Sequence, residues 1–121
     1  WLTDYEAALK QAKAQNKALL LDFTGSDWCG WCKKLKREVF DKPEFKTYAE
    51  SSLVLVEIDF PRAVYQTDAL KAQNQKLMDK FGIEGFPTII LLSAEGKEVG
   101  RTGYLPGGAG AYVKHLKELL K

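Results

Sequence analysis

Two short, almost uninterrupted apolar segments constrain the fold of this chain more than any other feature. The first is ALLLDFT, residues 18–24, and the second is LVLVEID, residues 53–59. Runs of this length and composition are typical of strands that other elements cover on both faces. Asp22 is the one charge inside the first run. Because an unpaired carboxylate is costly there, we expect Asp22 either at a solvated edge of the strand or as an acid with a raised pKa.

Helical patterns flank these two strands. Thr3 and Glu6 have the spacing of a capping box and predict a helix over residues 3–16. A second helix should begin at Cys29, and a third should run from about Pro43 to about Ser51. A polar helix should end at Gly82. The last helix should bury one apolar face, formed by Tyr112, Val113, Leu116, Leu119 and Leu120.

A hairpin completes the pattern. A strand is expected directly after Pro87, and the AEGK turn at residues 94–97 should join it to an antiparallel strand that ends near Gly103. This order of elements predicts an α/β fold with a mixed central sheet and helices on both faces. No linker interrupts the pattern, so we expect one domain over residues 1–121.

The composition and charge give little indication of a binding partner. The 121 residues contain 18 Lys and Arg against 16 Asp and Glu, a formal net charge of +2. So small a charge gives no electrostatic reason to expect nucleic acid or membrane lipid as a partner. No segment approaches the roughly eighteen apolar residues of a membrane-spanning helix, so no membrane insertion is expected. We expect a monomer.

Both cysteines lie in one segment, SDWCGWCKK, residues 26–34. A zinc site needs four ligands, and the chain adds only His115 on its last helix; two chains would have to pool four thiolates. A structural disulfide across so short a loop would constrain the unfolded chain little. A redox pair gains from the spacing, because one helical turn places the second sulfur beside the first. The spacing therefore favours thiol chemistry without a metal or other cofactor.

The positions of the two thiols suggest their roles. Cys29 falls where a helix begins, and unpaired N–H groups and the helix dipole stabilise an anion there. We therefore expect Cys29 to be the nucleophilic thiolate. Cys32 lies one turn inside the helix and is expected to be less accessible, which suits a resolving thiol that attacks after Cys29 has joined a substrate.

Two separated motifs resemble the thioredoxin-fold disulfide oxidoreductases. That family carries Trp-Cys-Gly-x-Cys-Lys after a strand ending in Asp-Phe, matched here by residues 28–33 after Asp22 and Phe23. KFGIEGFPTIILL, residues 80–92, is similar to the family's stretch ending in Gly-x-Pro-Thr. The resemblance runs over residues 18–120, and GSDWCGWC with VEIDFP looks most like the thioredoxin-like domains of exported bacterial proteins.

The resemblance implies a thioredoxin-like fold and thiol–disulfide exchange through Cys29 and Cys32. It assigns a proton relay to Asp22 and a cis peptide bond to Pro87. The chain departs from the family in two ways. An extra residue separates the Asp-Phe pair from the first cysteine, and the next strand carries only the charges of Glu57 and Asp59, where the family often has a Lys.

Aromatic and backbone groups around the thiols are candidates for binding substrate. Phe86 and Pro87 should line a groove for an extended chain, because a cis X–Pro bond leaves neighbouring backbone groups free to pair. Gly30 lies between the thiols. Trp28 is expected to pack into its loop and Trp31 to be exposed as part of an apolar binding surface.

These features favour an enzyme that reduces or isomerises protein disulfides and is recharged by a thiol reductant protein. An oxidant that introduces disulfides is a weaker alternative, since neither Gly30 nor Trp31 supplies a cation to the thiolate. Another alternative is a binding module that retains the fold without catalysis. The resemblance implies a periplasmic or otherwise extracytoplasmic location, with the cytoplasm as the alternative.

Overall fold

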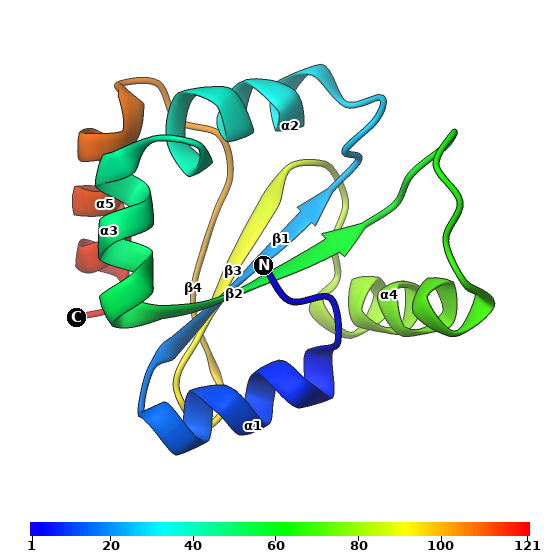
Figure 1. The fold of residues 1–121 in the computed structure, drawn as a ribbon, viewed down its shortest axis with the longest axis horizontal. Helices are drawn as coiled ribbons and strands as arrows, with labels where there is room; N and C mark the ends of the chain where they lie inside the picture. Colours follow the sequence, from blue (N-terminus) through cyan, green and yellow to red (C-terminus); the bar gives the residue numbers. More distant parts are fainter.

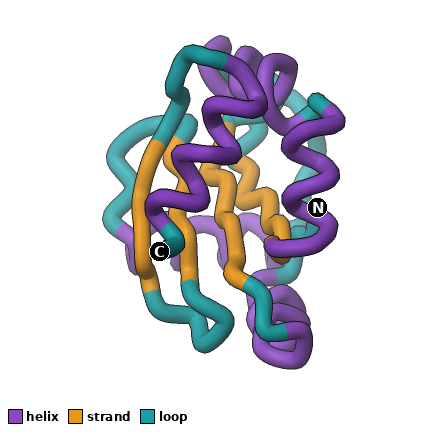
Figure 2. The backbone as a smooth tube through the Cα atoms, turned by 90° about the vertical axis from the view of Figure 1, so that its left-hand side faces the viewer, coloured by secondary structure: helices purple, strands orange, loops and turns teal.

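A mixed sheet of four strands in the order β2-β1-β3-β4 forms the centre of the protein in a computed structural model that describes residues 1–121. Strands β1 (Ala18–Thr24) and β2 (Leu53–Asp59) pair in parallel. Strands β3 (Thr88–Leu92) and β4 (Glu98–Thr102) add to β1 in antiparallel orientation, and Figure 2 shows the four strands side by side. The predicted mixed sheet is confirmed, and both apolar runs are strands with the predicted bounds.

Helices cover both faces of this sheet (Figure 1). Helices α1 (Tyr5–Gln15) and α4 (Asp68–Phe81) lie on one face. Helices α2 (Gly30–Leu35), α3 (Pro43–Ser52) and α5 (Gly108–Leu119) lie on the other. A π-helical turn, η1 (Lys36–Phe40), extends α2 without a break.

Strand β1 supplies side chains to both apolar layers. Leu19, Leu21 and Phe23 belong to the cluster beneath α1 and α4, whereas Leu20 belongs to the cluster beneath α2, α3 and α5. All four are fully buried. Because successive side chains of a strand point to opposite faces, Asp22 lies on the same face as Leu20. The chain therefore places a carboxyl group under the helix that carries the cysteines.

The start of α1 corrects one sequence prediction. The helix is capped by Asp4, whose carboxylate accepts the N–H of Ala7 at 3.1 Å, and not by Thr3. Asp4 has the extended backbone that a capping residue requires. Thr3 precedes it, where Leu2 forms an isolated bridge with Val56 and so pairs with the outer edge of β2. The pairing at Leu2 thus delays the helix by one residue.

The loops that follow β1 and β2 emerge at the same end of the sheet (Figure 1), as the parallel pairing of these strands requires. The first loop leads to Cys29 at the start of α2. The second loop covers residues 60–67 and leads to α4. None of the helices has the length and apolar character needed to cross a membrane.

Candidate active site at the Cys29–Cys32 disulfide

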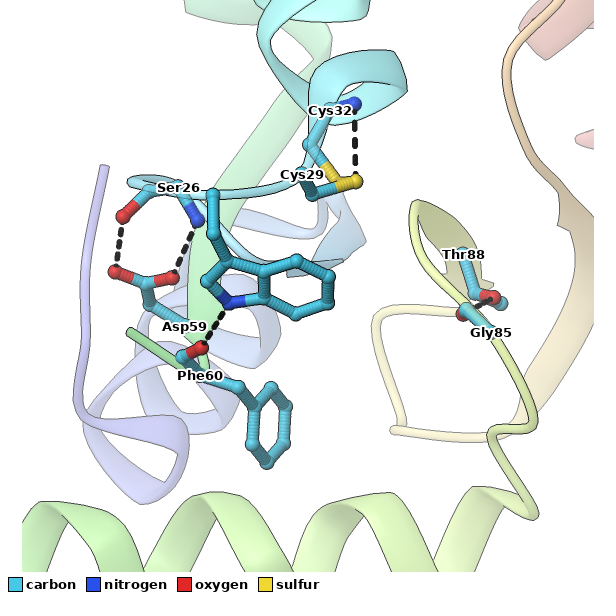
Figure 3. Close-up of a disulfide and its surroundings, with 8 residues drawn as sticks. Ser26, Cys29, Cys32, Asp59, Phe60, Gly85 and Thr88 are labelled. Carbon is cyan, nitrogen blue, oxygen red and sulfur yellow. Dashed lines mark hydrogen bonds between the residues drawn. A yellow bond between two sulfur atoms is a disulfide. The ribbon is translucent and has the colours of Figure 1, made fainter. Parts of the chain in front are cut away.

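Cys29 and Cys32 are joined by a disulfide at the start of α2, with Cα atoms 5.2 Å apart (Figure 3). Cys29 is the N-cap residue, with an extended backbone, and its Sγ accepts the N–H of Cys32 at 3.3 Å. The first N–H groups of a helix have no partner within it, so a sulfur at this place receives a hydrogen bond that stabilises negative charge. The predicted position of Cys29 is confirmed.

The exposure of the two cysteines differs from the sequence prediction. We expected Cys32 to be the less accessible residue, but both are 6% exposed in the disulfide form. In the disulfide form the two residues are therefore distinguished by the hydrogen bond that Cys29 Sγ accepts and not by their overall exposure.

Trp28 is packed into the loop before the disulfide, as predicted. Its indole N–H donates to the carbonyl of Phe60 at 2.8 Å, and the guanidinium of Arg62 lies 3.8 Å from the ring centre. Gly25 lies so close to this ring that a Cβ there would overlap it. Trp31, in contrast, is 58% exposed, with its ring 5.2 Å from that of Tyr104.

The loop after β2 is tied to the cysteine loop through two acidic residues. The carboxylate of Asp27 accepts the backbone N–H groups of Arg62, Ala63 and Val64 at 2.8–3.0 Å. These hydrogen bonds lower the pKa of Asp27. Asp59 accepts the backbone N–H and the hydroxyl of Ser26 (Figure 3). The sequence alone gave no sign of these partners, because each bond joins residues more than thirty positions apart.

The segment before β3 lies against the same aromatic group. The Phe86–Pro87 peptide bond is cis. The ring of Phe86 is stacked 5.2 Å from that of Phe60 and lies edge-on to Trp28 at 5.8 Å. The Thr88 hydroxyl donates to the carbonyl of Gly85 at 2.6 Å, which closes the turn (Figure 3). Trp28, Phe60 and Phe86 thus join the three loops around the disulfide.

Asp22 is a buried acid, not a residue at a solvated edge. It is 8% exposed, and its Oδ1 has no hydrogen-bond partner in the protein. Burial, with smaller contributions from Glu57 and Asp59, raises the pKa of Asp22 to about 8. Asp22 and Cys32 line the same cavity, which has a volume of about 870 Å³. The structure thus places the predicted relay residue and the predicted resolving thiol on the lining of one cavity.

The comparison with known families decides the class of protein. The thioredoxin-like domain family matches residues 5–118, nearly the whole chain. The chain belongs to the thioredoxin-like family. Its redox-active cysteine pair at the start of α2 makes it a thiol–disulfide oxidoreductase. The described residues contain no group of three or more His, Cys, Asp or Glu suited to a metal ion.

Relatives from Chlamydia pneumoniae support this class. The disulfide bond reductase DsbH is 41% identical over 117 residues, which cover 97% of this chain and 70% of DsbH. The thioredoxin-related protein DsbJ is 39% identical over 103 residues, which cover 85% of this chain and only 30% of DsbJ. A solved structure titled DsbH oxidoreductase superposes with a TM-score of 0.94 at 39% identity, covering 99% of this chain and 83% of that one.

Substitution of Gly25 tests how closely the loop packs on Trp28. Gly25→Ala should lower the free energy of unfolding by roughly 1–3 kcal/mol, because the added methyl group overlaps the indole ring. Gly30→Ala is the matched control, since a Cβ at Gly30 meets no atom within 4 Å. Urea denaturation of both variants in the disulfide form measures their free energies of unfolding. Equal stability of the two variants would contradict the packing described for Trp28.

The buried carboxyl of Asp22 predicts a pH-dependent stability. The pKa of Asp22 is about 8 in the folded protein, against an ordinary value of 3.8. Its contribution to the free energy of unfolding is therefore complete below pH 4 and is lost as the pH rises to 8. Asp22→Asn removes this loss of stability, because the amide does not ionise. The variant should be more stable than the wild type at pH 8–9 by on the order of a few kcal/mol, with the difference vanishing near pH 4.

Urea denaturation of the two disulfide forms across this pH range measures the difference. Glu95→Gln, at an exposed carboxylate in the turn before β4, is the control and should follow the wild type. A constant difference between Asp22→Asn and wild type at every pH would show that Asp22 titrates normally.

Proposed function

We propose that this protein reduces or isomerises protein disulfides through Cys29 and Cys32. The observation that carries the proposal is the position of Cys29 as the cap of α2, where its sulfur accepts a helix N–H. An acceptor at this place is stabilised as a thiolate, and the thiolate is the attacking species in disulfide exchange. The name of DsbH, a disulfide bond reductase, points in the same direction.

The proposed cycle uses the two sulfurs in order. The Cys29 thiolate attacks one sulfur of a substrate disulfide, and the other substrate sulfur leaves with the bonding electron pair. Cys32 then loses its proton to Asp22 and attacks Sγ of Cys29, which releases the second substrate sulfur. The substrate gains two electrons, and the protein returns to the disulfide form. The cavity shared by Asp22 and Cys32 supports Asp22 as the acceptor of that proton.

Substrate would bind over Gly30, Trp31, Phe86, Pro87 and the packed Trp28. Gly30 is exposed beside Cys29, and a side chain there would point into open space. Trp31 offers an exposed apolar surface one residue further along. Phe86 and Trp28 are half-buried and contact one another next to the disulfide. An extended chain could thus pass over the disulfide between Trp31 and the turn before β3.

The described surroundings favour reduction over the introduction of disulfides. Gly30 and Trp31 separate the cysteines, and neither supplies a cation to the sulfurs. Strongly oxidising pairs have additional interactions that stabilise the reduced thiolate form. In this protein the start of α2 is the one such interaction. We infer that a thiol reductant protein recharges the pair and that the chain acts as one monomeric domain over residues 1–121. By analogy with its Dsb relatives we infer an extracytoplasmic, periplasmic location.

Serine substitution tests the order of attack. Cys32→Ser should accumulate mixed disulfides with substrate proteins, because Cys29 attacks but nothing resolves the product. Cys29→Ser should accumulate none. Non-reducing gels of each variant incubated with an oxidised substrate protein measure the products. Equal trapping by both variants would overturn the assignment of roles.

A turnover assay separates the enzyme from a binding module. The wild type should accelerate the reduction of insulin by dithiothreitol, and each serine variant should fall to the background rate, as a non-catalytic module would. Equilibration of the wild type with a glutathione redox buffer gives the reduction potential of the Cys29–Cys32 pair. A potential close to that of the strong oxidants, about −120 mV, would contradict reduction as the direction.

A further inference from the structure

A second carboxyl group lies beside the proposed proton relay. Asp22 of β1 and Glu57 of β2 are register partners in the parallel pair. Partners in adjacent strands point to the same face of a sheet, so both side chains lie under α2 and η1. The family that the chain resembles often has a Lys near this place, and β2 of this chain has none.

The cavity under α2 connects these groups to solvent. It is lined by Cys32, Asp22 and Glu57, among other residues, and its volume of about 870 Å³ holds many water molecules. Asp22 is buried, whereas Glu57 is half-buried on the edge strand β2. Glu57 is therefore the more accessible carboxyl of this register pair.

Other charged groups near the pair leave Asp22 without a bonded cation. On β2, Asp59 is engaged with Ser26. Burial and Asp59 raise the pKa of Glu57, whereas the α-amino group of Trp1 and then Lys36 of η1 lower it; Lys36 is also bonded to Asp41 at 2.9 Å. The remaining titratable groups on this side are Lys33 of α2, Arg37 of η1 and the buried Tyr112 of α5, together with Lys17, Lys46 and Glu50 further along the cavity.

We propose that Glu57 is a positioning residue of the Asp22 relay, which holds the proton on Asp22 in the disulfide form. This inference rests on the proposed function. The negative charge of Glu57 disfavours ionisation of its register partner, so Asp22 keeps the proton that Cys32 delivered. Two carboxyls that interact in this way titrate as a coupled pair.

The proton balance of the cycle follows. When Cys32 attacks Sγ of Cys29, its proton moves to Asp22 and the substrate thiolate leaves. When a reductant thiolate later attacks Sγ of Cys29, the Cys29–Cys32 bond breaks and Cys32 leaves with the electron pair. Asp22 then returns the proton to Cys32.

The titration of Asp22 in the disulfide form tests the electrostatic step. The carboxyl carbon of Asp22, followed by NMR across pH 4–10, gives its midpoint in the wild type and in Glu57→Gln. The substitution should move that midpoint to lower pH by about one unit, a tenfold change in proton affinity. Glu57→Asp, which keeps the charge, should restore most of the wild-type midpoint, and Glu95→Gln should leave it unchanged. An unchanged midpoint in Glu57→Gln overturns the proposal.

A kinetic experiment tests the transfer. The rate of reduction of the disulfide by dithiothreitol, relative to wild type at each pH, should fall for Glu57→Gln as the pH rises above neutral, because Asp22 has then lost its proton. A ratio that is constant with pH overturns the relay role even if the midpoint moves. Should Glu57→Gln not fold, Glu57→Asp must still match the wild type in both measurements. Because the NMR titration needs no substrate, a failure in insulin reduction would disprove the proposed function alone.

Discussion

Burial of β1 from Leu19 to Thr24 is the constraint on which the rest of the structure depends. Its apolar side chains fill both layers, so the strand cannot shift in register without exposing one of them. This fixes where the chain leaves the sheet. The loop that follows has only five residues before α2 begins, and it places the Cys29 sulfur on the first free N–H groups of the helix. The reactivity of the thiol is thus set by the packing of a strand.

The same burial makes the carboxyl chemistry possible. An acid on an exposed strand would titrate near its ordinary pKa and would be ionised throughout the neutral range. Asp22 is instead enclosed by the sheet below and the helix above, and it faces Glu57 rather than a cation. A buried carboxyl group with this environment exchanges protons near neutral pH, where thiols also exchange them. Strand and helix thereby bring an acid and a thiol into the same range of pH.

Much of the fold was predictable from the sequence, because it depends on local patterns. The apolar runs of β1 and β2, the glycine that ends α4 and the turn before β4 each carry their own signal. The cap of α1 was misassigned because the pairing of Leu2 with β2 is a long-range contact. For the same reason the sequence did not reveal the partners of Asp27 or the equal exposure of the cysteines. Asp22 and the two thiols were predicted from their spacing and from the family motif, while the neighbour that influences Asp22 required the register of the sheet.

The bonds from Asp27 to three consecutive backbone N–H groups determine which residues of the loop after β2 can be substituted freely. They hold the beginning of the loop after β2 against the cysteine loop, while the side chains of Val64 and Tyr65 remain 62% and 85% exposed. Backbone N–H groups are the same in every residue except proline, so the anchor does not depend on which side chains follow it. The side chains at the tip of this loop can therefore change without loss of the anchor, while the thiols beneath keep their geometry.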